Sequence, residues 1–255
     1  MKLEGYGWIR DLPDRRDLLY VAPPEVSEAL PPSVDLRSGF TPPYNQGELG
    51  SCTANAIAGA LQFLEQKEGE DDPVMPSRLF IYYNERSLEG SVGTDSGAQI
   101  RDGIKTVVKD GFCPESAWPY DIVRYDRRPP KECYRLALRE RVSQYLRLSG
   151  NLVPLLTCLA TGFPFVFGFS VYESFESERV KTTGVAQLPR PSERLVGGHA
   201  VVAAGYDMAD RRFLVRNSWG GGWGMDGYFT MPYEYLADPM LAADFWTIRR
   251  VPVVD

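Results

Sequence analysis

Three residues in this sequence are of the types that together perform nucleophilic catalysis. Cys52 follows the turn NQGELGS and opens the alanine-rich run TANAIAGALQF. The chain contains a single histidine, His199, so no other side chain can serve as an imidazole base. Asn217 lies further along the chain and can hold that imidazole through a hydrogen bond. A cysteine attacks carbonyl carbon when a base accepts its proton and a third group orients the base.

The residues around Cys52 predict a nucleophile at the start of a helix. Apolar residues recur at helical spacing after Cys52 and predict one buried stripe, while Ser51 and Thr53 are candidate helix caps. The positive end of the helix dipole favours a thiolate over a thiol. The alternative is that Cys52 is a small buried apolar residue, as most free cysteines are.

His199 and Asn217 are each predicted to lie at the end of a strand. His199 precedes the apolar run AVVAAGY, which predicts a buried strand starting at the histidine, and Asn217 follows the short run FLVR. Two neighbouring antiparallel strands can bring the Asn217 amide oxygen to one imidazole N–H and thereby fix the tautomer. The alternative is a lone histidine whose hydrogen bonds are satisfied in the core.

These segments resemble the papain-like cysteine peptidases. That family's nucleophile signature is C-G-[SA]-C-[WY], with histidine and asparagine about 130 to 150 residues downstream. Here the motif is LGSCT, His199 lies 147 residues after Cys52 (199 − 52) and Asn217 lies 165 residues after it (217 − 52). Gln46 matches the family glutamine that precedes the nucleophile, and NSWG, GWGMDGY and LPPSVDLRS are also similar.

Two positions depart from the family pattern. Leu49 replaces the usual cysteine, so its disulfide is absent, and Thr53 replaces the usual aromatic residue. The resemblance covers about residue 30 to the C-terminus. It is strongest to compact bacterial members of the family, through GWIRDLPDRRD and DSGAQIRDGIKTVVKDGFCPESAWPYD.

The resemblance implies a cysteine endopeptidase that uses a Cys52 thiolate and a His199 imidazolium and forms a thioester acyl-enzyme. Asn217 would orient His199, and the Gln46 side chain would stabilise the oxyanion. The chemistry needs no metal and no organic cofactor. The residues implied to bind substrate or shield the site are Ser96, Gly97, Ala98, Ile100, Gly198, Ala200 and Trp219. Three of them (Ala98, Ile100 and Ala200) would make an apolar pocket for the second residue before the cut.

Two other functions remain open from the sequence. The same triad can serve an acyl transferase or deamidase that acts on glutamine, and product analysis distinguishes these from a peptidase. The chain can also be a non-catalytic binding module on an enzyme fold. Retention of Cys52, His199, Asn217 and Gln46 together argues against that last function.

The elements that must position these residues are predicted to form an α+β, papain-like two-lobe fold. The chain has 255 residues, 44% of them hydrophobic, which allows one large domain or two lobes that share a cleft. We expect a peptidase domain at 30–255, with a helical lobe at about 50–150 and an antiparallel, β-barrel-like lobe at about 160–250. The uncharged run 149–172 contains prolines and glycines, so it predicts helix, turn and strand rather than a membrane span.

Residues 1–29 are predicted to form an N-terminal extension. Tyr6 and Trp8 are amphipathic aromatics just upstream of the catalytic lobe, which suggests that the extension lies over the cleft and inhibits the enzyme. The alternative is an arm packed on the surface elsewhere.

Composition argues against several other classes of protein. A net charge of −6 is untypical of a nucleic-acid binder. The start of the chain has no apolar h-region, so a cytoplasmic location is the default expectation, with no membrane association. We expect a monomer acting on a peptide or protein substrate. Cys113 and Cys133 can pair, but an odd cysteine remainder beyond Cys52 favours reduced thiols.

Overall fold

The computed structural model describes residues 5–69, 73–140, 142 and 144–249. Residues 1–4 of the predicted extension and 250–255 of the predicted domain lie outside this part of the chain. The helices are α1 (Pro24–Ser27), α2 (Cys52–Lys67), α3 (Arg78–Glu89), α4 (Ile100–Asp110), α5 (Lys131–Ala137), α6 (Leu152–Ala160), α7 (Glu178–Thr183) and α8 (Tyr233–Ala237), with 3-10 turns η1 (Arg37–Gly39), η2 (Ile122–Arg124) and η3 (Glu173–Glu176). The strands are β1 (Trp8–Ile9), β2 (Ser33–Asp35), β3 (Ala98–Gln99), β4 (Gln144–Arg147), β5 (Phe165–Tyr172), β6 (Leu195–Asp207), β7 (Arg212–Arg216), β8 (Tyr228–Pro232) and β9 (Ala242–Arg249).

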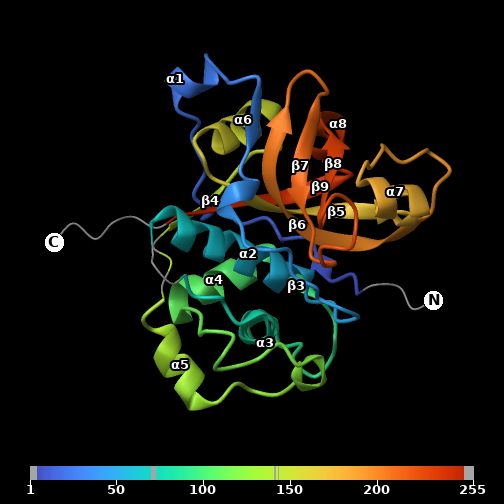
Figure 1. The fold of residues 1–255 in the computed structure, drawn as a ribbon. Helices are drawn as coiled ribbons and strands as arrows, with labels where there is room; N and C mark the ends of the chain where they lie inside the picture. The colour runs from blue at the N-terminus through green and yellow to red at the C-terminus, as the bar shows by residue number, and fades with distance from the viewer. Residues whose placement is uncertain (1–4, 70–72, 141, 143, 250–255) are drawn as a thin grey trace.

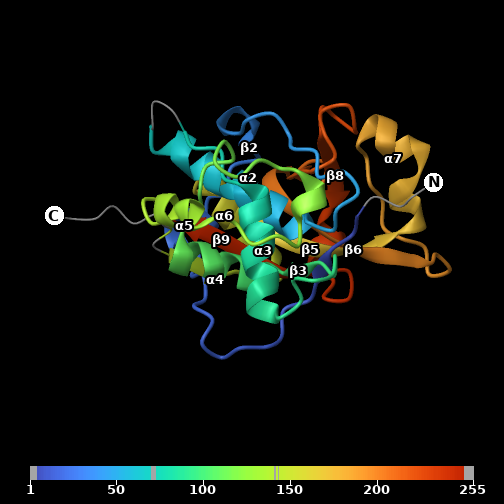
Figure 2. The same ribbon diagram turned by 90° about the horizontal axis from the view of Figure 1, so that it is seen from below.

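The helices α3, α4 and α5 make one half of the molecule and the sheet makes most of the other (Figure 1). Helix α3 begins where the Ser77 hydroxyl accepts a hydrogen bond from the Phe80 backbone N–H. It ends at Gly90, whose φ of 72° lies in the left-handed region that glycine adopts at low cost. Seen from below, α3 and α4 lie in front of the sheet (Figure 2). Helix α3 therefore has a clear start signal at Ser77 and a clear stop signal at Gly90.

Helix α2 lies between α3 and α4 on one side and strands β5, β6 and β9 on the other. Every residue from Cys52 to Glu65 is buried, so the predicted single apolar stripe is wrong. Small residues such as Ala54 and Ala58 let both layers approach this helix closely. Ser51 stands at the N-cap position, as predicted, but its side chain makes no capping bond and its hydroxyl bonds to the Tyr120 hydroxyl instead. The prediction of Thr53 as a cap is wrong, because Thr53 lies inside the helix and donates to Glu85.

The second lobe is an antiparallel sheet with the strand order β4-β9-β5-β6-β7-β8, to which β2 adds by pairing with the end of β6. Among the described strands β4 pairs only with β9 and β8 only with β7, so the sheet stays open and the predicted barrel-like closure is absent. Its phenylalanine-rich core joins β5, β7 and β8 through Phe165, Phe167, Phe213 and Phe229. This buried sheet holds the strands that carry His199 and Asn217.

The uncharged run at 149–172 forms helix α6, a turn and strand β5, as predicted. None of the described helices is long and apolar enough to cross a membrane. The position of His199 differs from the prediction, because β6 begins at Leu195 and pairs His199 with Phe169 in its interior. Asn217 directly follows β7, as predicted.

Candidate active site

Cys52 is the first residue of α2 and its side chain is fully buried. The preceding turn is held in place because the Gly50 N–H donates to the Asp95 carboxylate at 3.0 Å, and the Tyr82 hydroxyl donates to the same carboxylate. The thiol lies within hydrogen-bonding reach of the backbone of Ala200, the residue after His199, and of Gly7. The structure therefore brings the end of the turn, strand β6 and the N-terminal arm together at one sulfur atom.

His199 and Asn217 are hydrogen-bonded to each other. The distance from His199 Nε2 to Asn217 Oδ1 is 2.8 Å, and Oδ1 also accepts the Ser218 backbone N–H at 2.9 Å. Because this oxygen is an acceptor, Nε2 carries the ring proton and Nδ1 keeps its lone pair. Nδ1 is buried and has no hydrogen-bond partner among the described residues. The imidazole thus has one nitrogen held and the other available to a thiol proton.

Aromatic rings enclose this imidazole. Trp219 stacks on His199 with ring centroids 4.8 Å apart and planes 23° apart, and Phe169 meets the ring edge-on at 5.7 Å. Tyr6 of the arm also packs edge-on, at 5.9 Å from His199. Together they keep water from the hydrogen bond between His199 and Asn217, which strengthens it.

Gln46 is buried beside the start of α2. Its amide oxygen accepts the Ser218 hydroxyl at 2.6 Å, so its amide nitrogen faces the opposite way. That nitrogen donates to the carbonyl oxygens of Leu49 at 2.9 Å and of Gly5 at 2.7 Å. Ser218, which sequence reasoning missed, thus contacts both Gln46 and Asn217.

The N-terminal arm runs directly through this cluster. The Gly7 carbonyl accepts the Ala98 N–H at 2.7 Å, and β1 pairs in parallel with β3, with Trp8 opposite Ala98. A Cβ on Gly7 would lie 1.7 Å from the Gly50 carbonyl oxygen, and one on Gly97 would lie 2.1 Å from the Gly7 carbonyl oxygen. Glycine at these positions is what allows the backbones to approach so closely.

The other predicted substrate-binding residues lie in three different surroundings. Gly97, Ala98 and Gly198 contact the arm, and Gly97 has a φ of 74° that favours glycine. Ile100 and Ala200 belong to the core around α2. Ser96 is exposed, and among the described residues its hydroxyl bonds only to the neighbouring Gly97 carbonyl at 3.2 Å.

The electrostatics of the covered site favour neutral groups. Burial raises the pKa of Cys52 to about 12, against the opposing effect of hydrogen bonds from the backbone of Ala200 and Gly7. Burial lowers the pKa of His199 to about 4, although the bond to Asn217 opposes this. The predicted lowering of the thiol pKa does not hold in this state, because the enclosure that the arm completes penalises both charges.

The sequence did not predict which side chains hold the N-terminal arm against the rest of the protein. Asp11 accepts the Trp246 indole N–H at 2.8 Å, and Asp244 accepts the Trp8 indole N–H at 3.0 Å. Asp17 pairs with Arg147 at 2.8 Å. Partners this far apart in the sequence leave no local pattern, so only a three-dimensional structure identifies them.

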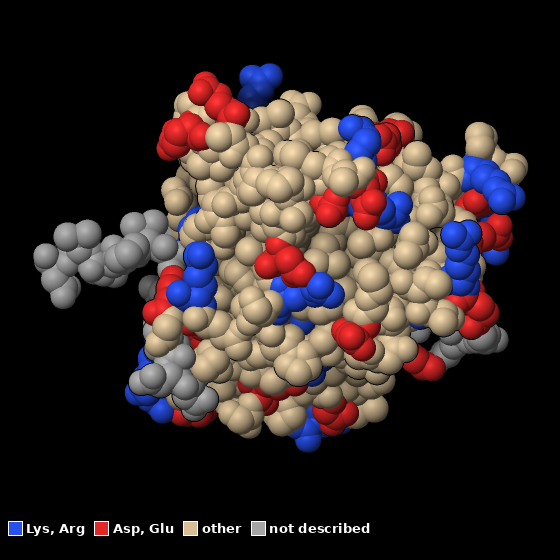
Figure 3. All heavy atoms as spheres, turned by 45° about the horizontal axis from the view of Figure 1, so that its top comes forward, with Lys and Arg blue, Asp and Glu red and all other residues tan. Residues whose placement is uncertain are grey.

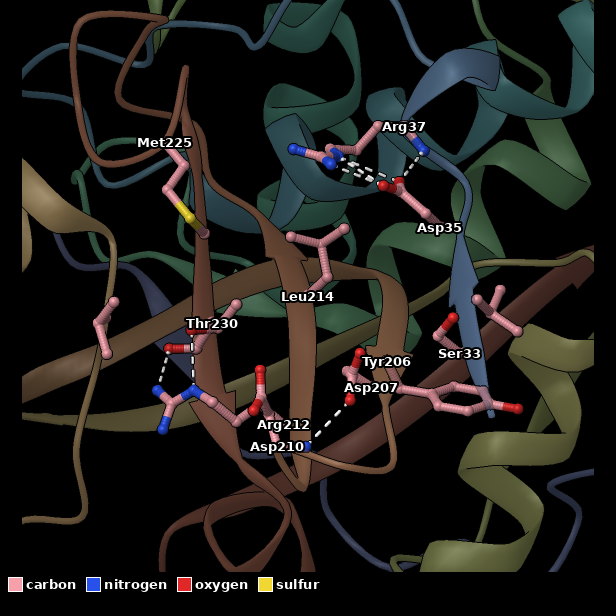
Figure 4. A pocket seen from close by; sticks show the side chains of 12 residues that line it. Ser33, Asp35, Arg37, Tyr206, Asp207, Asp210, Arg212, Leu214, Met225 and Thr230 are labelled. Carbon is pink, nitrogen blue, oxygen red and sulfur yellow. Dashed lines mark hydrogen bonds and ion pairs between the residues drawn. The ribbon is translucent and has the colours of Figure 1, made fainter. Parts of the chain in front are cut away.

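One hollow and one face of the described part of the chain lack the chemistry of this cluster. A hollow of about 660 Å³ beside β2, β6 and β7 contains Asp35, Arg37 and Arg212, whose charged groups bond to partners within it (Figure 4). None of the predicted catalytic residues lines this hollow. On the face shown in Figure 3, basic and acidic side chains alternate, so that face has no continuous basic area of the kind that binds nucleic acid.

The described cysteines are all free thiols. Cys113 lies within hydrogen-bonding reach of Cys133, and the Cys133 thiol also contacts the Ala117 carbonyl at 3.7 Å. Burial raises the pKa of Cys158 and of both these cysteines. High pKa values keep all three as weakly reactive thiols.

Comparison with known proteins identifies the family. The model of the papain family cysteine proteases matches residues 30–238. The crystal structure of xylellain, a cysteine protease from Xylella fastidiosa, superimposes with a TM-score of 0.91 and 46% identity over 98% of this chain and 97% of that one. A peptidase C1-like protein of Acanthamoeba polyphaga mimivirus is 44% identical over 98% of this chain and 89% of its own length.

More distant relatives share the fold. Digestive procathepsin L 3 of Tenebrio molitor has a TM-score of 0.71 at 20% identity, covering 91% of this chain and 73% of that one. The predicted resemblance to papain-like peptidases, and to compact bacterial members among them, is confirmed. The chain belongs to the papain family of cysteine peptidases and is a hydrolase.

Proposed function

We propose that the protein is an endopeptidase in which Cys52 is the nucleophile, His199 the acid–base group and Asn217 the residue that orients His199. The observation that carries this is the 2.8 Å bond from His199 Nε2 to Asn217, which leaves Nδ1 without a partner among the described residues. The thiol of Cys52 lies against the backbone of the residue that follows His199. A thiol and an available imidazole nitrogen in one cluster support proton transfer between them.

The proposed reaction has two stages. His199 Nδ1 takes the Cys52 proton, and the thiolate attacks the scissile carbonyl carbon to form a C–S bond. His199 then gives the proton to the leaving amine as the C–N bond breaks, which leaves a thioester. Water, deprotonated by His199, attacks the thioester carbonyl, and the carboxyl product and the thiol are released.

Gln46 and the Cys52 backbone N–H are proposed to stabilise the oxyanion. The Gln46 amide nitrogen already holds a peptide carbonyl oxygen, that of Gly5, at 2.7 Å. The bond from Ser218 to the other end of the amide keeps this donor in place. A fixed donor of this kind is the arrangement that stabilises a developing negative charge.

We further propose that the N-terminal arm inhibits the enzyme by occupying its substrate site. The Gly5 carbonyl oxygen accepts the amide N–H of Gln46, and the backbone of Gly7 contacts the Cys52 thiol. Trp8 pairs with Ala98. A peptide substrate would need the same backbone edge, because extended peptides bind by adding to exposed strands. The arm and a substrate therefore exclude each other.

The direction of the arm explains why it would not be cut. A cleavable peptide must point its leaving amine at His199, so its N-terminal part must lie along Ala98. The arm has the opposite direction, with Tyr6 against His199 and the later residue Trp8 against Ala98. Its peptide bonds are therefore presented to Cys52 with reversed polarity.

Peptide hydrolysis with product analysis tests the proposed reaction. We expect the Gly7→Ala variant, in which the arm cannot bind in the active site, to generate new peptide termini from a protein substrate. Cys52→Ser in that background should abolish them, and Cys133→Ser, at a buried cysteine of α5, should not. Ammonia release or isopeptide bonds without new termini would instead indicate glutamine deamidation or acyl transfer.

A further inference from the structure

The peptide group between Leu49 and Gly50 is bonded by a different side chain on each of its two sides. Its N–H donates to the Asp95 carboxylate, at 3.1 Å from Oδ1 and 3.0 Å from Oδ2. Its carbonyl oxygen accepts one N–H of the Gln46 amide at 2.9 Å. Because the C=O and N–H of a trans peptide point in opposite directions, the carboxylate that orients the N–H also orients the carbonyl.

The orientation of this carbonyl decides where the second N–H of the Gln46 amide points. An amide nitrogen carries two protons. One donates to the Leu49 carbonyl oxygen, and the other donates to the Gly5 carbonyl oxygen at 2.7 Å. This second N–H is the donor that the proposed reaction uses for the oxyanion. A donor that is held in advance in the right direction is what stabilises a developing negative charge.

Helix α3 keeps the Asp95 carboxylate in place. The hydroxyl of the buried Tyr82 donates to Asp95 Oδ1 and accepts the Gly97 N–H at 3.3 Å. One turn further along the helix, the buried Arg86 guanidinium lies 3.9 Å from the centre of the Tyr82 ring. Arg86 also donates to the Thr94 carbonyl oxygen at 2.8 Å. The loop that carries Asp95 is therefore fixed from the core, although Asp95 itself is exposed.

We propose that Asp95 is a positioning residue that acts through the peptide group of Leu49 and Gly50 to direct the Gln46 N–H at the oxyanion. This inference rests on the proposed peptidase function and on the role proposed there for Gln46. No disulfide among the described residues fixes the turn that contains this peptide group. The Asp95 carboxylate, 45 residues further along the chain than Gly50, supports the turn from outside. Without that support, the Leu49 carbonyl can rotate and the Gln46 N–H loses its direction.

The test is a double-mutant cycle on kcat for a peptide substrate, with the full-length Gly7→Ala chain as the parent enzyme. Asp95→Ala should lower kcat on the order of tenfold, which is less than the loss expected of Gln46→Ala, because the donor is misdirected rather than removed. In the Gln46→Ala background, Asp95→Ala should change kcat by less than about twofold, since no amide remains to be positioned. General damage to the fold would instead lower kcat equally in both backgrounds.

Further variants separate the position of the carboxylate from its charge. Asp95→Asn keeps Oδ1, the oxygen that accepts both Gly50 and Tyr82, so kcat should stay within about threefold of the parent. Asp95→Ala should leave KM within about twofold, because the lost interaction serves the transition state. Tyr82→Phe removes the partner of both Asp95 and Gly97, so it should raise KM as well as lower kcat. Asp210→Ala, at an exposed aspartate between β6 and β7, is the matched control and should change neither.

The outcomes separate this inference from the proposed function. An unchanged kcat in folded Asp95→Ala protein, or an equal loss in both backgrounds, overturns the role of Asp95 and leaves the peptidase intact. If Asp95→Ala does not fold, Tyr82→Phe takes its place in the same cycle. An unchanged kcat in Gln46→Ala removes the proposed oxyanion donor and the role of Asp95 with it. If folded Gly7→Ala protein cuts no peptide, the proposed function fails as well.

Discussion

The Gly7→Ala substitution should release the arm from the active site. A Cβ at residue 7 would lie 1.7 Å from the Gly50 carbonyl oxygen and 2.5 Å from its carbonyl carbon. Ordinary contact begins at 3.4 Å, so the two backbones must separate by well over 1 Å. Both atoms are backbone atoms at the rigid turn before α2, so the arm is the part that moves.

The size of the effect follows from the bonds that such a movement breaks. The arm loses the Gly7 carbonyl bond to Ala98 at 2.7 Å, the Gly5 carbonyl bond to Gln46 at 2.7 Å and the Trp8 bond to Asp244 at 3.0 Å. At about 1 kcal/mol each, the loss is about 3 kcal/mol. Since 1.4 kcal/mol is a factor of ten, the equilibrium between covered and open sites shifts by on the order of 100-fold.

The assay is the rate at which an epoxide inhibitor of cysteine peptidases alkylates Cys52. While the covered form dominates, this rate is proportional to the open fraction, so Gly7→Ala should increase it on the order of 100-fold. Gly93→Ala is the matched control, because a Cβ there meets nothing within 4 Å. An unchanged rate in folded Gly7→Ala protein would show that the arm does not control access to Cys52.

Three further results are expected. In the Gly7→Ala background, Gln46→Ala should lower kcat on the order of 10²-fold as one oxyanion donor is lost, and an unchanged kcat would mean that another group fills this role. Burial raises the pKa of Cys52 to about 12 in the covered site, so the pH at which alkylation accelerates should be lower in Gly7→Ala than in the wild type, and coincident profiles would contradict this. Burial also raises the pKa of Glu85 well above its usual value, so the folded state holds a proton that the unfolded state releases above about pH 4.5. The contribution of Glu85 to stability is complete below this pH and is lost as the pH rises. In Glu85→Gln, the free energy of unfolding measured in urea should therefore fall less steeply with rising pH than in the wild type. An equal pH dependence in both proteins would contradict this role of Glu85.

Local patterns in the sequence predicted the elements that carry the candidate catalytic residues. The turn before Cys52, the helix after it and the strand before Asn217 are all present. The turn, the helix and the strand can be predicted because glycine at turns and apolar periodicity are patterns that extend over only a few neighbouring residues. The interior position of His199 in β6 was missed, because the apolar run that predicts the strand begins only after His199, whereas β5 also pairs with Gly197 and Gly198.

Contacts between distant segments could not be predicted in the same way. The bonds from Asp11 to Trp246 and from Trp8 to Asp244 join the two ends of the chain. The need for glycine at residue 7 comes from the Gly50 carbonyl, which no local pattern places there. The raised thiol pKa of Cys52 has the same origin, because the helix dipole is a local effect whereas burial depends on the whole fold.

Mapping the site of epoxide alkylation is the decisive test of Cys52 as the nucleophile and His199 as its base. Gly7→Ala protein would be treated with the inhibitor, its intact mass measured and the modified residue identified, beside the same protein carrying His199→Ala. We predict one adduct, on Cys52, that is lost without the histidine. An adduct on Cys113, Cys133 or Cys158, or a Cys52 adduct that forms equally fast without His199, would contradict it.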